Sequence, residues 1–300
     1  MDLDRALAAL RPLGGFSVLH ASQPPPRPLP TLAHVHARGH EDATPDDQED
    51  PPEQRITPEQ RIPPEQNDPP AQQDPRARRP PSAQHDPLGF RVRKVGAVLG
   101  TPESRVAASV AHQGLAARLW SVTLGCAVLY GRVPDLAPRL LHWDPDAASP
   151  DDLWLTEVRP LPADAPTLAG VVLRAHLCPL TATVHARYRV ATGLLWGNAA
   201  SALAGAGREL EGWARRHGRT DTAARARSLT ADLLGHPLLA GTGTLTGTAF
   251  RRRSCCLYYR VPGAGVCGDC CFTRPPRPSS PPRPPRSAPP PRSSPGAPSG

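Results

Sequence analysis

Lysine is nearly absent from this 300-residue sequence: Lys94 is the only one, although the formal net charge is +8. Arginine therefore carries the positive charge, in a composition rich in Ala, Arg, Pro and Gly that is typical of GC-rich genes. Five arginines stand in a proline-rich C-terminal stretch, and without them the net charge falls by five, to +3. These five are Arg274, Arg277, Arg283, Arg286 and Arg292. The remaining charge is ordinary, so it does not indicate binding to nucleic acid.

Long apolar runs are also missing. The longest one, Leu119 to Tyr130, has twelve residues, whereas a membrane-spanning helix needs about 20. The N-terminal residues Met1 to Arg5 include two acids, where a secretory signal requires positive charge. We therefore expect a soluble, cytoplasmic protein without a transmembrane segment, and peripheral membrane contact stays open. In the cytoplasm, clustered cysteines are more often metal ligands or redox groups than structural disulfides.

Common catalytic motifs are absent as well. The sequence contains no Gly-x-Ser-x-Gly elbow, no Walker loop and no His-Glu-x-x-His pair. Residues Gly263 to Gly268 match the dinucleotide pattern G-x-G-x-x-G, but no helical pattern follows them. We interpret this match as accidental, since the pattern binds a pyrophosphate only where it opens a helix.

Proline, by contrast, is abundant, with 41 residues concentrated in two stretches. The first contains the sequence Pro-Glu-Gln-Arg-Ile repeated with a period of six residues, beginning at Pro52 and at Pro58. One aliphatic residue per repeat buries too little surface to offset chain entropy, so we expect disorder over 38–87. The tail 274–300 is predicted to be disordered for the same reason. His34, His36 and His40 stand at the edge of the first stretch, and we expect them to be solvated.

The remaining sequence predicts an α+β fold, a mostly helical single domain with a few strands. Apolar spacing of three to four residues indicates helices, and short runs rich in Val, Leu and Trp indicate strands. The predicted helices are Glu103–Leu119, Trp120–Tyr130, Leu194–Arg216 and Thr220–Leu239, and the predicted strands are Leu153–Leu155 and Leu168–Leu173. The predicted organisation is an N-terminal part of the domain at 1–37, the insert at 38–87, a helical core at 88–250, a cysteine motif at 251–273 and the tail at 274–300.

Five of the seven cysteines lie between Cys255 and Cys271. Four of them, Cys255, Cys256, Cys267 and Cys270, have the spacing C-C-x10-C-x2-C. Four thiolates that converge on one point require a metal or a cluster to offset their repulsion. Structural zinc and an iron–sulfur cluster are both compatible with this spacing, and a redox dithiol is less so. Adjacent cysteines point to different sides of the backbone, which slightly favours ligands on two irons.

The other cysteines and the neighbouring arginines have simpler interpretations. Cys271 has no place in the spacing and is predicted to be a bystander, while Cys126 and Cys178 lie in apolar runs and are predicted to be buried. Three arginines, 251–253, directly precede the first cysteine. Their positive charge would stabilise the reduced state of an anionic cluster and raise its potential, although solvated surface arginines remain an equal alternative.

The stretch Arg251-Arg252-Arg253-Ser254-Cys255-Cys256-Leu257-Tyr258-Tyr259-Arg260, followed by Gly263 to Cys270, resembles the C-terminal cluster motif of FhuF-like ferric iron reductases. The segments Leu195–Ala202 and Val106–Leu119 are similar to that family as well. This resemblance spans about residues 88–272. It implies that Cys255, Cys256, Cys267 and Cys270 bind a [2Fe–2S] cluster. The family usually has an aliphatic residue at the position of Cys271, which leaves a ligand swap open.

The resemblance further implies a cytoplasmic reductase that passes one electron to Fe(III) in a ferric siderophore and releases Fe(II). Because no motif for binding NAD(P)H or flavin is found, a separate ferredoxin or reductase would supply the electron. Two other functions stay open. A non-enzymatic zinc-binding protein would be colourless, whereas an iron–sulfur sensor would be coloured but would not turn over ferric chelates.

Overall fold

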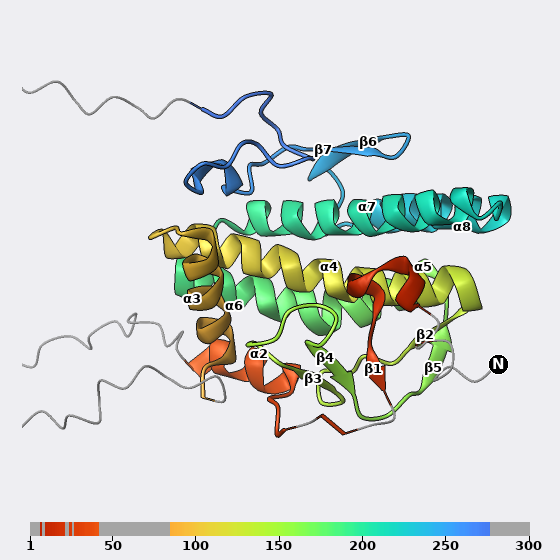
Figure 1. Cartoon of the computed structure of the whole chain (residues 1–300), viewed down its shortest axis with the longest axis horizontal. Helices are drawn as coiled ribbons and strands as arrows, with labels where there is room; N and C mark the ends of the chain where they lie inside the picture. Colours follow the sequence, from red (N-terminus) through yellow and green to blue (C-terminus); the bar gives the residue numbers. More distant parts are fainter. Residues whose placement is uncertain (1–6, 8–9, 22–23, 26, 42–84, 277–300) are drawn as a thin grey trace, which may run out of the picture.

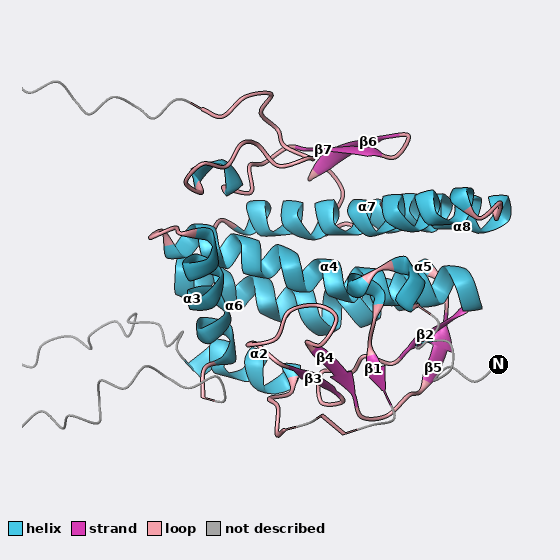
Figure 2. Ribbon diagram, viewed as in Figure 1, coloured by secondary structure: helices cyan, strands magenta, loops and turns pink. Residues whose placement is uncertain are grey.

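The computed structural model describes the whole chain except residues 1–6, 8–9, 22–23, 26, 42–84 and 277–300. Its helices stack in layers, with α7 and α8 above α4 and α6, and small strands and α2 below (Figure 1). A β-hairpin and the cysteine loops lie on the outer side of α7. Figure 2 shows that helices dominate and strands are short, which confirms the predicted α+β class.

The central helix α4, Ser104–Tyr130, packs against α7, α3 and α6. It joins the two helices predicted at Glu103–Leu119 and Trp120–Tyr130 into one. Leu119 and Trp120 are adjacent, and neither is a glycine or a proline that would interrupt a helix. Most of its residues are buried, as befits a helix that is covered on several sides. The helix ends at Gly131, whose φ of 68° is accessible to glycine at little cost.

The next layer consists of α7, Thr192–Arg216, and α8, Thr220–Leu234, which are antiparallel neighbours. Both predicted helices are confirmed, although the second ends five residues before Leu239. The two helices approach closely at Gly207, where a Cβ atom would lie 2.3 Å from the Thr230 hydroxyl. Glycine at this position therefore sets the spacing of the layer.

The predicted strand Leu168–Leu173 is wrong, because these residues lie in a helical segment. That segment consists of α5 (Ala165–Ala169), the π-helix η4 (Gly170–Leu177) and α6 (Cys178–Tyr188). A short apolar run does not distinguish a buried strand from a buried helix. The local signal for the helix is Asp164, whose carboxylate accepts a hydrogen bond from the Thr167 amide at 2.8 Å.

This segment, Ala165–Tyr188, is long and apolar enough to cross a membrane by length and composition alone. Among the described helices no other has that property. In its most apolar stretch, 61% of the residues are buried inside the fold, which is typical of a core helix.

The strands form three small sheets. The first has the order β1-β4-β3, where β1 is His20–Ala21, β3 is Leu141–Trp143 and β4 is Leu153–Leu155. This arrangement confirms the predicted strand Leu153–Leu155. The second pairs β2, Arg132–Pro134, with β5, Pro160–Pro162, and the third pairs β6, Gly243–Thr246, with β7, Ala249–Arg252. The β6–β7 hairpin leads directly into the cysteine motif.

Both edges of the predicted insert 38–87 are helical. Helix α2, Leu32–Glu41, extends past its start, and helix α3 begins at Pro87 and runs to Leu99. Asp86 fixes the start of α3, because its carboxylate accepts the Gly89 amide at 3.0 Å and also binds the Arg187 guanidinium. The proline repeat and most of the tail lie outside the described residues.

The prediction of solvated histidines is wrong for His34 and His36, which lie half-buried in α2. The ring of His36 contacts the ring of His176 in η4, with 5.6 Å between the ring centroids. Burial lowers the pKa of His36 to about 3. Contact with α6, together with the His36–His176 ring contact, therefore orders this helix, which crosses the predicted start of the insert at residue 38.

The N-terminal segment is held to α4 by Arg118, whose side chain is 2% exposed. Its guanidinium binds Asp152 at 2.8 Å and donates to the carbonyl oxygens of Phe16 and Val18. Asp152 is also buried, with 4% of its side chain exposed. This ion pair joins three segments that are distant in sequence.

Candidate metal centre

Two loops beside α7 carry the clustered cysteines. The first follows β7 and contains Cys255 and Cys256, and the second, after the short helix η5 (Tyr258–Arg260), contains the remaining three. Leu257 has a φ of 69°, a left-handed conformation that turns the chain sharply after the adjacent cysteines. The Leu257 amide donates to the Cys255 sulfur at 3.3 Å. The turn therefore brings the Cys255 sulfur within hydrogen-bonding distance of the Leu257 amide.

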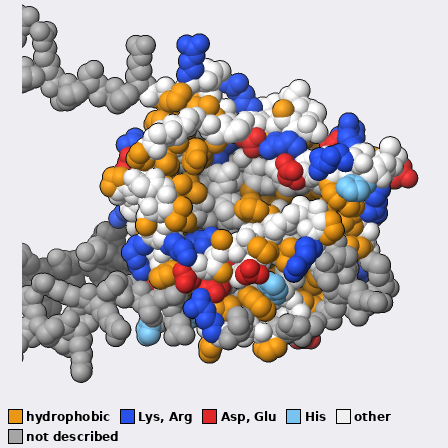
Figure 3. Space-filling view, viewed as in Figure 1, with side chains coloured by type: hydrophobic (Ala, Val, Ile, Leu, Met, Phe, Trp, Pro, Cys, Tyr) orange, Lys and Arg blue, Asp and Glu red, His pale blue; other side chains and the backbone are white. Residues whose placement is uncertain are grey.

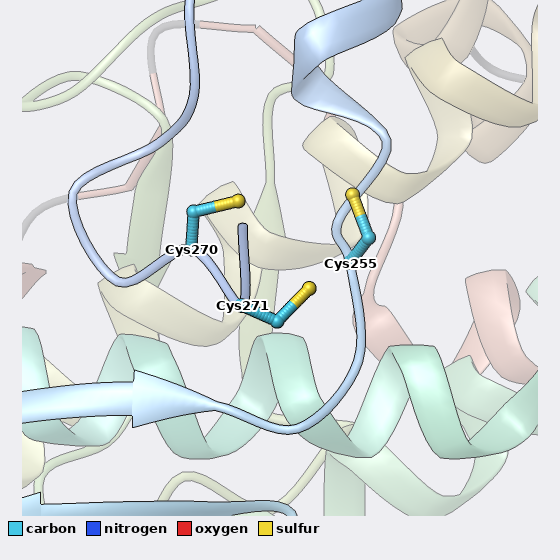
Figure 4. Close-up of side chains that lie close together, drawn as sticks. All are labelled: Cys255, Cys270 and Cys271. Carbon is cyan, nitrogen blue, oxygen red and sulfur yellow. The ribbon is translucent and has the colours of Figure 1, made fainter. Parts of the chain in front are cut away.

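The five sulfur atoms form two groups. The Sγ atoms of Cys255, Cys270 and Cys271 all lie within 4.8 Å of one another, and Figure 4 shows them converging from two different loops. The Sγ atoms of Cys256 and Cys267 lie 3.4 Å apart and form the second group. Cys255 and its neighbour Cys256 thus lie in different groups, and so do Cys267 and Cys270.

This division fits a two-iron cluster better than a single zinc ion. Four thiolates at about 2.3 Å from one zinc would lie roughly 3.8 Å from each other. Within the described residues, no four cysteine sulfurs lie that close together; the largest group has three members. A [2Fe–2S] cluster held by four cysteines takes two thiolates on each iron, and Cys256 with Cys267 provides one such pair.

The thiols also differ in acidity. The hydrogen bond with Cys267 lowers the pKa of Cys256 to about 6, and the Arg252 charge adds to this effect. The same pairing, together with burial, raises the pKa of Cys267. Burial raises the pKa of Cys255 to about 11. The loops therefore stabilise a thiolate at Cys256 before any metal binds, and deprotonated sulfur is the form that ligates metal.

Arg252 is the buried member of the arginine run, with 2% of the residue exposed, whereas Arg251 and Arg253 are exposed. Its guanidinium donates to the side-chain oxygen of Asn198 at 2.6 Å and to the carbonyl oxygen of Leu194 at 3.1 Å. Other donors on the group reach Ser254 and Gln113. All four acceptors are neutral. Among the residues that the structure describes, none offers a carboxylate within ion-pair distance of this guanidinium.

A chain of polar side chains connects the first cysteine loop to the helices beneath it. Ser109 on α4 donates its hydroxyl to the Cys256 carbonyl at 2.8 Å. Asn198 on α7 donates to Ser109 while accepting from Arg252. At Gly197 a Cβ atom would lie 2.7 Å from the Ser254 hydroxyl, so the loop approaches the α7 backbone closely. The segment Leu195–Ala202, singled out by resemblance, is therefore the surface on which the motif lies.

The second loop is anchored to α7 through Asp269. Its carboxylate accepts the Ser201 hydroxyl at 2.6 Å and lies 3.4 Å from the Arg208 guanidinium. Its backbone oxygen accepts the Arg252 amide at 3.0 Å, which ties the two loops together. The sequence analysis missed Ser109, Asn198 and Asp269. A polar Asn198 inside an Ala- and Leu-rich helix is the signal that could have indicated one of them.

The remaining cysteines differ in how well they match their predictions. Cys126 is fully buried in α4, as predicted, and burial raises the pKa of its thiol to about 12. Cys178 is half-buried rather than buried. Cys271 was predicted to be a bystander, yet its sulfur lies with those of Cys255 and Cys270. The G-x-G-x-x-G match at 263–268 lies in turns and loop, and the described residues that follow it, 269–276, are not helical.

The distribution of charged side chains can be followed on one face of the molecule. On the face in Figure 3, Lys and Arg side chains alternate with acidic and apolar ones and do not gather into one patch. Several arginines are also paired with acids, such as Arg27 with Asp144 and Arg260 with Glu103.

Residues 252–272 match the FhuF 2Fe-2S C-terminal domain. This match confirms the resemblance at the cysteine motif, and together with the sulfur geometry it supports a [2Fe–2S] cluster as the cofactor. No curated protein matches the chain. The match begins at Arg252 and ends at Phe272, so the FhuF-type motif includes the buried arginine and all five clustered cysteines. The choice of four ligands among these five stays a prediction.

Proposed function

We propose that this chain is a cytoplasmic one-electron reductase that converts Fe(III) in a ferric siderophore to Fe(II). The observation that carries the proposal is the FhuF-type motif, in which the cysteine sulfurs divide into two groups. When bound, a [2Fe–2S] cluster supplies a one-electron redox centre. We assign Cys255, Cys256, Cys267 and Cys270 as its ligands.

The chemistry of the substrate explains why one electron is sufficient. Siderophores hold iron through hard oxygen donors, which bind Fe(III) far more tightly than the larger, less charged Fe(II). Adding one electron to the iron weakens every bond to the chelator, and no covalent bond in the chelator has to break. The reaction therefore requires no nucleophile or general base, in keeping with the absence of the common hydrolytic motifs from the sequence.

The remaining parts of the protein have supporting roles in this proposal. The helical core at 88–250 positions the cysteine loops through Ser109, through Asn198, and through the hydrogen bond from Ser201 to Asp269 of the second loop. The electron comes from a separate donor, a ferredoxin or a reductase. No dinucleotide-binding strand–turn–helix unit occurs in the described part of the chain.

The test begins with anaerobically purified protein. We expect a red-brown protein with about two irons and two sulfides per chain and a rhombic EPR signal after reduction. The reduced protein, mixed with the ferric chelate of a linear trihydroxamate, should release Fe(II) to a ferrous-specific trap, one Fe(II) per cluster oxidised. A colourless protein with stoichiometric zinc would contradict the cluster. A coloured protein that transfers no electron to the chelate would favour a sensor.

A further inference from the structure

A cavity of about 430 Å³ opens directly beside the second cysteine loop. One wall is formed by Cys267, Gly268 and Asp269, which belong to the FhuF-type motif. The N-terminal segment Leu13–Ser17 and residues of α4 and α7 form the rest of the lining. The cavity therefore lies where three parts of the chain, distant in sequence, meet a predicted cluster ligand.

We propose that this cavity binds the ferric chelate during reduction, an inference that rests on the proposed function. Its volume is within the range of pockets that hold small molecules. A chelate seated there would lie beside Cys267, one of the predicted ligands. Because electron transfer becomes rapidly slower with distance, a site in contact with a ligand residue is the most effective position for the substrate.

The space between α4 and α7 exists because the facing side chains are small. Ala117 and Ser121 contribute from α4, and Gly205 and Ala206 contribute from α7. All four are half-buried, and none of them fills the space that separates the helices at this point. Elsewhere the same two helices are in close contact. The hollow is thus a local feature of the α4–α7 interface beside the motif.

The polar groups of the lining are suited to an organic chelate of low net charge. Its charged side chains are Arg208, Glu209 and Asp269, and the first and third are paired at 3.4 Å. The Glu209 side chain forms no hydrogen bond or ion pair with any residue that the structure describes, and it is exposed. The lining therefore offers no surplus of positive charge to attract a strongly anionic complex. Phe16 lies at the cavity with 49% of its surface exposed, which gives the carbon skeleton of a chelator an apolar contact.

A second cavity, of about 700 Å³, lies between α3 and α4 and provides a comparison. It is larger, but no cysteine or motif residue lines it. Ala97 lines this second cavity, just as Ala206 lines the first. The two alanines allow the same bulky substitution in a cavity beside the motif and in a cavity away from it.

The experiment measures binding separately from reduction. The gallium(III) chelate of a linear trihydroxamate, which cannot be reduced under these conditions, is titrated calorimetrically into the cluster-loaded protein. We expect Ala206→Trp on α7 and Ala117→Phe on α4 each to weaken binding by about tenfold or more, because each occupies the cavity. Their cluster absorption should be unchanged. The matched control, Ala97→Trp, should bind as the native protein does.

The outcomes distinguish the site from the function. If both cavity variants bind the gallium chelate normally while the native protein reduces the ferric chelate, the site is wrong and the function stands. The same conclusion follows if a protein that reduces the ferric chelate does not bind the gallium one. If the native protein neither binds nor reduces, both proposals are overturned.

Discussion

Two arginines are almost completely buried in the described part of the chain, and their surroundings differ. Arg118 and Arg252 are each 2% exposed. Arg118 has a carboxylate partner, Asp152, at 2.8 Å, together with backbone carbonyl oxygens. Arg252 is surrounded by neutral acceptors from Asn198, Leu194, Ser254 and Gln113 alone. A buried charge without a counter-charge is costly, so the difference indicates that something else balances Arg252.

The cysteine motif supplies that balance. The positive charge of Arg252 favours the thiolate forms of Cys256 and Cys267. A [2Fe–2S] cluster with four thiolates is negative in both oxidation states and more negative when reduced. Arg118 is thus a cation neutralised by a carboxylate within the fold, whereas the charge of Arg252 acts on the thiols of Cys256 and Cys267. Arg251 and Arg253, next to it in sequence, remain at the surface.

Removing a cluster ligand should have the largest effect, because the cluster and the negative charge that we expect to balance Arg252 are then both lost. Cys256→Ser and Cys267→Ser are each expected to abolish the visible absorption and the EPR signal, and to leave Arg252 without its counter-charge. We therefore also expect a lower free energy of unfolding. Cys271→Ser is the matched control and should keep the cluster. If Cys271→Ser bleaches the protein and Cys270→Ser does not, the ligand assignment is exchanged between these neighbours.

The next largest effect is expected at Arg118, whose charge is already balanced by Asp152. Arg118→Met leaves Asp152 buried without a partner, and we expect a loss of about 3–5 kcal/mol in the free energy of unfolding. Urea denaturation measures this loss. The double variant Arg118→Met with Asp152→Leu should recover much of it, because no unpaired charge then remains. A midpoint potential that changes in Arg118→Met would show that this arginine also acts on the cluster.

Acid should destabilise both regions through buried histidines. Burial lowers the pKa of His112, on the Arg252 side of α4, to about 3, and that of His176, in η4, to about 4. Both values lie below the ordinary pKa of 6.5, so the unfolded chain binds more protons between pH 6.5 and these values, and stability falls as the pH falls through that window. The expected slope is about 1.4 kcal/mol per pH unit for each histidine.

Denaturation curves at pH 7 and pH 5 measure this effect, and His176→Gln should make the dependence shallower. An unchanged dependence in that variant would mean that His176 is not neutral in the fold. The same measurement on His112→Gln reports on the region around Arg252, since the Arg252 charge contributes to the lowered pKa of His112.

The smallest expected effect is a change in the midpoint potential of the cluster when Arg252 loses its charge. Arg252→Gln keeps hydrogen-bonding capacity but removes the charge, so the reduced cluster loses stabilisation and the midpoint potential should fall by tens of millivolts. About 59 mV corresponds to a tenfold change in a one-electron equilibrium. Arg251→Gln and Arg253→Gln are matched controls with exposed side chains, and their shifts should be much smaller. Equal shifts in all three variants would remove the distinction between buried and exposed arginines.

Much of the candidate site followed from the sequence, because the signals are local. The spacing of Cys255, Cys256, Cys267 and Cys270 identified the motif, and helical periodicity identified α7 and α8. The run 168–173 was misassigned to a strand because its residues are apolar without periodicity, and burial on several sides removes the pattern that distinguishes helix from strand. Helix α2, Leu32–Glu41, crosses the predicted boundary between the N-terminal part of the domain and the insert at residue 38, a continuity that composition concealed.

The sequence by itself determined which residue types are present and how they are spaced, and this was enough to indicate a four-cysteine cluster motif. The tertiary structure decided which arginine of the run 251–253 is buried, how the five sulfurs divide into two groups, and where a cavity opens beside Cys267. The reason is physical. Ligand spacing is a property of one segment, whereas burial, counter-charge and cavities depend on surfaces that Asn198, Ser109 and Phe16 contribute from elsewhere in the chain.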